Sequence, residues 1–191
     1  MLFPVRIRSF PGSNENASCF EKSEGCNTCS VFRFLVLSRN SASLLLYAVG
    51  MACKDDKGEW VLINGNQTCL LFLYYIIKNR IATGKMQPTD FIVKTIVTTE
   101  LIKAVADKNK IEMLDCYTGF KWIAREIRLS EGKQQYIGGG EESYGFLAED
   151  FVRDKDAVSA CSLLAEICAW AKDQCCFKNI LSQKIPCGIK H

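Results

Sequence analysis

The chain has 191 residues, 48% of them apolar, which is enough material for the core of one domain or slightly more. Its 24 basic and 21 acidic residues leave a net charge of +3, and this balance argues against a nucleic-acid-binding or membrane-surface protein. Apolar runs such as residues 70–77 are far shorter than the roughly 20 residues that cross a bilayer. No signal peptide is predicted either, so we expect a cytoplasmic protein.

The eleven cysteines include a single C-x-x-C pair, Cys26 and Cys29. A zinc ribbon needs a second pair, and the one histidine, His191, rules out a Cys2His2 site. A metal or redox role for this pair remains open beside the simpler interpretation, which is free thiols in a reducing compartment. Cys161 and Cys168 lie a heptad apart among Leu and Ala, so we predict that they are small core residues.

The first part of the chain has little periodic pattern. Residues 9–30 are polar and rich in Gly and Ser, which predicts a loop or disorder. Residues 31–37 and 43–53 are apolar and indicate two strands, or one strand and a buried segment. We therefore treat residues 1–53 as an irregular N-terminal segment.

A regular alternation begins at residue 54. Residues 54–63 predict a hairpin with its turn at 56–58. Residues 64–84 predict a buried helix capped by Asn66 and ended by Gly84. A β-branched strand is expected over 90–98.

The alternation continues to residue 174. We expect an amphipathic helix over 98–109 with Leu101 facing inward, a strand over 111–116, a helix over 118–132 and a strand over 134–138. The last helix, over 153–174, is expected to turn five apolar side chains to the core: Val158, Leu163, Leu164, Ile167 and Trp170.

This order predicts an α/β sheet covered by helices. In such sheets, ligands bind outside the carboxyl ends of the strands. Two polar loops follow strands in this way, the "CYTGFK" loop after 111–116 and the "GGGEESYGF" loop after 134–138. We expect both loops at one edge of the sheet.

Several interpretations of "GGGEESYGF" can be compared. A Walker phosphate loop requires Lys and Ser or Thr after its second glycine, whereas Phe146 and Leu147 follow here. Two carboxylates would also repel the phosphates of a nucleotide or dinucleotide. A nucleophile elbow needs glycine where Glu141 stands, and a triad needs a histidine that the chain lacks before its last residue. Adjacent glutamates are expected to point apart rather than flank a glycosidic bond. Binding of sugar hydroxyls and a solvated turn both remain open.

The same stretch, followed by "FVRDKDAVSA", resembles the sugar-binding loop and the next helix of the phosphohexomutases, the phosphoglucomutases and phosphomannomutases. The resemblance runs in order through "KDDKGEWVLINGNQT", "TIVTTELIKAVADKN", "DCYTGFKWI" and "RDKDAVSACSLLAEI". It implies a three-layer α/β/α domain with a mixed sheet over residues 54–174, similar to the family's third domain. Residues 1–53 would then be a degenerate remnant of the second domain, and residues 175–191 a divergent tail.

The resemblance also implies a reaction. The family's enzymes are isomerases that move a phosphoryl group within a hexose, interconverting hexose 1-phosphate and hexose 6-phosphate. They use Mg²⁺ and hexose 1,6-bisphosphate. The hexose phosphate is therefore the expected partner of this chain, and neither nucleic acid nor membrane is expected.

Matched position by position, the resemblance assigns substrate binding to Glu141, Ser143 and Gly140 of the acidic loop. Thr118 and Gly119 match a second loop that faces the sugar.

Two basic residues and one acidic residue complete the comparison. Lys155 matches a residue that contacts phosphate or assists proton transfer. Arg153 either helps to bind substrate or forms a surface ion pair with Asp154 or Asp156. Glu142 is expected to fix the loop rather than to contact the sugar.

The chain departs from the family at both ends. Ser43, Leu45 and Tyr47 stand where the metal-binding aspartates belong, so no metal site is expected in this chain. The loop that carries the nucleophile and the phosphate-binding fourth domain have no counterpart. We expect a partial mutase with little or no turnover alone. The alternatives are a sugar-phosphate-binding module, completed by mutase domains on another chain, and an inactive truncated fragment.

Overall fold

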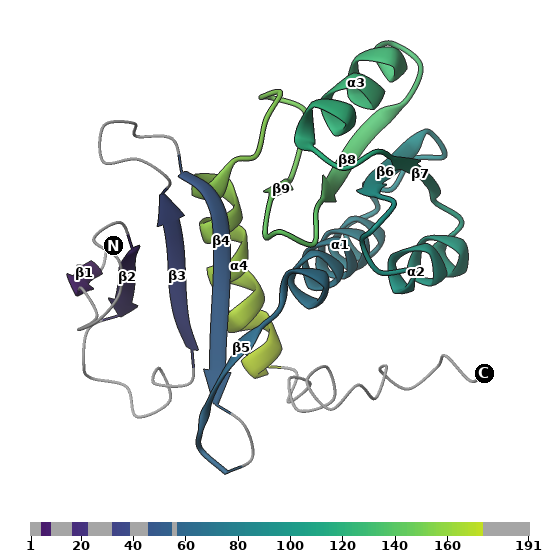
Figure 1. Cartoon of the computed structure of the whole chain (residues 1–191). Helices are drawn as coiled ribbons and strands as arrows, with labels where there is room; N and C mark the ends of the chain where they lie inside the picture. The colour runs from purple at the N-terminus through teal and green to yellow at the C-terminus, as the bar shows by residue number, and fades with distance from the viewer. Residues whose placement is uncertain (1–4, 9–16, 23–31, 39–45, 55–56, 174–191) are drawn as a thin grey trace.

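The computed structural model of the chain describes residues 5–8, 17–22, 32–38, 46–54 and 57–173. These residues form two sheets and four helices (Figure 1). The predictions for Cys26 and Cys29, and for the tail after residue 174, concern residues outside the described ranges.

The first sheet is antiparallel and follows chain order. Its strands are β1 (Val5–Arg8), β2 (Ala17–Lys22), β3 (Phe32–Ser38), β4 (Leu46–Lys54) and β5 (Trp60–Ile63). The two predicted strands before residue 54 are confirmed as β3 and β4, and the predicted hairpin as β4–β5, with Met51 opposite Ile63. Strand β2 corrects the prediction of a loop over residues 9–30. The local pattern did not show this strand, because it forms by pairing with β3, which lies farther along the chain.

The second sheet is mixed and has the order β7-β6-β8-β9. Strands β6 (Asp90–Thr95), β7 (Glu112–Cys116) and β8 (Gln135–Gly140) run parallel, while β9 (Phe146–Leu147) pairs with β8 antiparallel. The carboxyl ends of the three parallel strands therefore meet at one edge.

Helices cover both faces of this sheet, which confirms the three-layer α/β/α prediction. Helices α1 (Gly65–Ala82), α2 (Leu101–Asn109) and α4 (Ala157–Asp173) share one apolar core, whereas α3 (Phe120–Ser130) packs with the other. Strand β6 shows the period of two: Ile92 belongs to the first core, and Phe91 and Val93 to the second.

Helix α4 connects the two sheets. It contacts β3 and β4 of the first sheet and β9 of the second, and Figure 1 shows it alongside β4. The Cys168 and Met51 sulfurs lie 3.4 Å apart across this contact. Leu164 and Ile167 are buried as predicted.

The structure corrects several local predictions. The cap of α1 is Asn64, in a capping box with Gln67; Asn66 instead accepts a hydrogen bond from the Thr99 N–H at 2.9 Å. Leu101 is exposed because α2 begins only there, after a turn that ends β6 at Thr95. Val158 is also exposed, in the first turn of α4. No described helix combines the length and apolar character needed to cross a membrane.

Candidate functional site

The three glycines expected in a loop belong to strand β8 instead. A Cβ on Gly139 would lie 2.4 Å from the Val93 carbonyl oxygen, so this strand requires glycine to approach β6 closely. The acidic loop itself consists of residues 141–145. It is closed by the Glu141 N–H, which donates to the Gly145 carbonyl at 2.9 Å.

Glu141 joins the two predicted loops. Its side chain is buried, and Oε1 accepts a hydrogen bond from the Gly119 N–H at 2.9 Å. Gly119 precedes the first residue of α3, where unpaired N–H groups and the helix dipole favour a carboxylate. Glu141 thus caps a helix that begins about twenty residues earlier in the chain, and the prediction that the loops meet at one sheet edge is confirmed.

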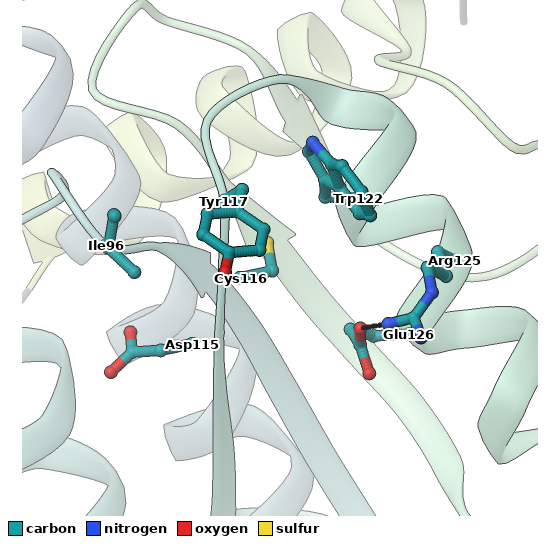
Figure 2. A pocket seen from close by; sticks show the side chains of 7 residues that line it. All are labelled: Ile96, Asp115, Cys116, Tyr117, Trp122, Arg125 and Glu126. Atoms are coloured by element: carbon teal, nitrogen blue, oxygen red, sulfur yellow. Dashed lines mark hydrogen bonds and ion pairs between the residues drawn. The ribbon is translucent and has the colours of Figure 1, made fainter.

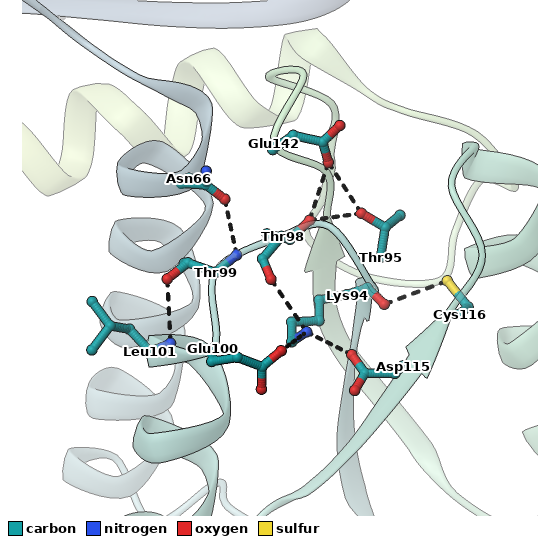
Figure 3. A network of polar contacts seen from close by, with 10 residues as sticks. All are labelled: Asn66, Lys94, Thr95, Thr98, Thr99, Glu100, Leu101, Asp115, Cys116 and Glu142. Carbon is teal, nitrogen blue, oxygen red and sulfur yellow. Dashed lines mark hydrogen bonds and ion pairs between the residues drawn. The ribbon is translucent and has the colours of Figure 1, made fainter.

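Glu142 contacts the end of β6 and the turn that follows it. Its Oε2 lies 3.1 Å from the Thr95 hydroxyl and 3.3 Å from the Thr98 hydroxyl (Figure 3). The adjacent glutamates therefore point apart, as expected, one toward α3 and the other toward the turn before α2.

Hydroxyl groups lie on the outer side of this arrangement. Ser143 and Thr118 are both exposed, and the Ser143 Oγ lies 3.5 Å from Glu141 Oε2. One carboxylate and two hydroxyls from two loops can accept and donate hydrogen bonds to a polyhydroxyl ligand.

Lys155 lies beside the acidic loop. A Cβ on Gly145 would be 2.5 Å from Lys155 Cδ, so the lysine stem covers that glycine. Its Nζ is 3.0 Å from Asp154 Oδ1 and 5.1 Å from the centre of the Phe120 ring. The structure thus brings Lys155 to the region of Glu141 and Gly119.

Arg153 lies elsewhere. It forms an ion pair with Glu131, and its guanidinium donates to the Asp150 carbonyl at 2.8 Å. Glu131 follows the last residue of α3, and the 11 residues of that helix span roughly 16 Å. Arg153 therefore pairs with Glu131 rather than with Asp154 or Asp156. Because Glu131 lies at the opposite end of α3 from Gly119, the structure does not bring Arg153 together with Glu141.

Sequence reasoning missed a buried ammonium group close to this edge. Lys94 Nζ contacts Asp115 Oδ1 at 2.7 Å, Glu100 Oε1 at 2.9 Å and the Thr98 carbonyl at 3.3 Å (Figure 3). Burial lowers the pKa of Lys94, but hydrogen bonds and charges from Asp115 and Glu100 outweigh it and raise the pKa overall. A lysine inside the β-branched run "DFIVKT" was the signal that could have identified it.

A shallow pocket of about 350 Å³ lies between the ends of β6 and β7 and helix α3 (Figure 2). Tyr117 and Trp122 line it with their ring centres 5.4 Å apart, and Arg125 pairs with Glu126 at 2.7 Å. None of the predicted binding residues lines this pocket.

The metal prediction concerns residues that are not described. Ser43 and Leu45 lie outside the described ranges, as does the side chain of Tyr47. Across the part of the chain that the structure does describe, no three His, Cys, Asp or Glu side chains come together as a metal ion requires.

The part of the chain that carries this site is similar to known proteins. Residues 64–182 match the family model for phosphoglucomutase/phosphomannomutase, alpha/beta/alpha domain III. The phosphoglucomutase of Staphylococcus aureus strain USA300 is 42% identical over 116 residues, and that of strain N315 is 41% identical. Each alignment covers 61% of this chain and 20% of the relative, so the chain spans about a fifth of the length of these curated relatives.

A solved structure from Thermus thermophilus, described as a phosphomannomutase, has the same fold. It matches with a TM-score of 0.53 and 23% identity, over 72% of this chain and 27% of that chain.

Proposed function

Because the chain belongs to the phosphoglucomutase/phosphomannomutase family, we propose that it is the sugar-binding part of a phosphohexomutase. In this proposal it holds a hexose phosphate while the family's reaction interconverts the 1-phosphate and the 6-phosphate. The observation that carries the proposal is the Glu141 carboxylate, which the Gly119 N–H holds between two loops that both present hydroxyl groups.

The geometry suits a sugar more than a phosphate at the acidic loop. Glu141 and Glu142 give the loop negative charge, which disfavours a phosphate. Sugar hydroxyls, in contrast, donate hydrogen bonds readily to a carboxylate. Ser143 and Thr118 can bond a hydroxyl as donor or acceptor, so they suit a ring that binds in two opposite orientations. The substrate phosphate is assigned to Lys155, the cation beside the loop.

Phosphoryl transfer is assigned to other parts of the enzyme. Catalysis of this reaction depends on electrostatic stabilisation of the transferred group, to which metal ions and cations contribute. In this proposal Mg²⁺ and hexose 1,6-bisphosphate act at other domains of the mutase, outside the residues that the structure describes. A cytoplasmic location is part of the same proposal, supported by the thiols of Cys69, Cys116, Cys161 and Cys168, which form no disulfide.

Calorimetric titration of the full chain with glucose 1-phosphate and mannose 1-phosphate tests the binding role. Glu141→Gln should weaken binding about tenfold or more, because a hydrogen bond to a charged group contributes about 1.5–3 kcal/mol. The glutamine oxygen can still accept from the Gly119 N–H, so the fold is expected to survive. Ser143→Ala should weaken binding about fivefold, as expected for a neutral hydrogen bond.

Glu149→Gln is the matched control, because Glu149 is exposed and follows β9 rather than lying in the acidic loop. It should bind like the wild type. Wild-type protein without saturable binding would contradict the proposal. In a coupled mutase assay with Mg²⁺ and a bisphosphate activator, clear turnover by the pure chain would contradict the division of labour.

A further inference from the structure

Three oxygens of Glu142, Thr95 and Thr98 form a closed triangle (Figure 3). The two hydroxyl oxygens lie 2.7 Å apart, and Glu142 Oε2 lies 3.1 Å from Thr95 and 3.3 Å from Thr98. Two hydroxyl protons serve three contacts, so one contact has no proton between its oxygens. Assigning the protons to the two shortest contacts makes Thr98 the donor to Thr95, and Thr95 the donor to Glu142.

Lys94 holds the other side of Thr98. Its three ammonium protons meet three acceptors, the Thr98 carbonyl and the carboxylates of Glu100 and Asp115. The Lys94 side chain is fully buried, and Asp115 belongs to the neighbouring strand β7. The turn that carries Thr98 is therefore anchored to both β6 and β7.

The backbone of the acidic loop is confined on another side. A Cβ on Gly65 would lie 1.6 Å from the Glu142 carbonyl oxygen, so α1 begins directly against the loop. The Val49 N–H donates to the Tyr144 carbonyl at 3.3 Å. The loop backbone thus packs against α1 and β4, and the Glu142 side chain adds a further attachment at the end of β6.

We propose that Lys94, Thr95 and Thr98 are positioning residues for the acidic loop. They hold Glu142 in place, and Glu142 keeps its neighbours Glu141 and Ser143 in the geometry that faces a ligand. A loop ordered in advance avoids the cost of ordering it on binding. The consequence for sugar affinity rests on the proposed function, whereas the ordering of the loop does not depend on it.

Amide hydrogen exchange in the full chain tests the ordering without any ligand. The reporter is the Glu141 amide, whose hydrogen bond to Gly145 closes the loop. Thr95→Val should increase its exchange about fivefold, since Glu142 loses the closer of its two threonine hydroxyls and keeps only Thr98, at 3.3 Å. Thr98→Val should have a smaller effect because Thr95 can still donate to Glu142. Thr95→Ser should restore protection, and Lys94→Met should act in the same direction as Thr95→Val.

Thr83→Val is the matched control, because Thr83 is an exposed residue at the end of α1. It should leave the Glu141 amide unchanged. Unchanged Glu141 exchange in Thr95→Val would overturn the proposal, and so would an equal acceleration of amides throughout β6–β8, which indicates general destabilisation. Failure of the wild type to bind hexose phosphate, with the Thr95→Val and Thr95→Ser exchange results as expected, would contradict the proposed function alone and support the positioning role.

Discussion

At the scale of single residues, Gly119 links the two loops of the site. Its φ of 105° and ψ of 130° lie in a region that residues with a side chain avoid. This conformation aims its N–H at Glu141 and begins helix α3. A Cβ at this position would meet no atom within 4 Å, so the glycine is required by its backbone angles rather than by lack of space.

We therefore expect Gly119→Ala to destabilise the fold by about 1–3 kcal/mol, through backbone strain alone. Relief of that strain turns the N–H away from Glu141, so affinity for hexose phosphate should fall as well. Urea unfolding and calorimetric titration measure the two effects. Gly84→Ala is a suitable control, because Gly84 also has a positive φ, of 67°, but lies at the far end of α1. It should lose stability without losing affinity, and parallel losses of affinity in both variants would contradict this account.

At the scale of elements, the glycines of strand β8 set how closely it packs against its neighbours. Gly139 lies against the backbone of β6, whereas Gly138 faces the ends of flexible side chains, with Leu73 Cδ2 3.1 Å from the position of a Cβ. The strand therefore continues through Gly140, where the sequence pattern indicated a loop. The acidic loop is consequently short and tightly closed.

This difference predicts unequal costs for two similar substitutions. Gly139→Ala should destabilise the fold by about 3 kcal/mol, because its methyl group would overlap a carbonyl oxygen that can move only with its strand. Gly138→Ala should cost about 1 kcal/mol, because the Leu73 and Ile76 side chains can shift. Denaturant midpoints of the two variants provide the measurement. A larger loss of stability for Gly138→Ala than for Gly139→Ala would contradict the close packing of Gly139 against β6.

At the scale of the whole molecule, folding raises the pKa of several buried thiol and phenol groups. Burial raises the pKa of the thiols of Cys69, Cys116 and Cys168 to about 12. The pKa of Tyr136 is also raised, chiefly by burial. The folded state therefore keeps protons that the unfolded state releases at lower pH.

The stabilising contribution of these thiols should be complete below the ordinary thiol pKa of 9.0 and should be lost as the pH rises toward about 12. The free energy of unfolding, measured with urea across this range, is thus expected to fall. The double variant Cys69→Ala/Cys168→Ala should show a shallower fall relative to its own stability at pH 8. A steeper or unchanged slope would contradict the assignment to buried thiols.

The amino-acid sequence alone was enough to predict the order and type of the elements from residue 54 onward, except the two-residue strand β9. Local periodicity carries that information, since a strand repeats every two residues and a helix every 3.6. It also determined the family, through several motifs in one order, and the pair of loops that meet at the sheet edge. The local helical pattern also explains why Cys168 was correctly predicted as a core residue.

Which side chains meet depends on how the elements pack together. Glu141 caps α3 from a separate loop, Glu142 reaches Thr95 and Thr98, and Arg153 pairs with Glu131 rather than with its neighbours. Lys94 stands within a β-branched run that signals its burial, but its contacts with two carboxylates emerge only from the packed sheet. The partners of Glu141 and Glu142 lie 22, 44 and 47 residues away in the chain. Such contacts follow from the packing of the layers, which no local pattern encodes.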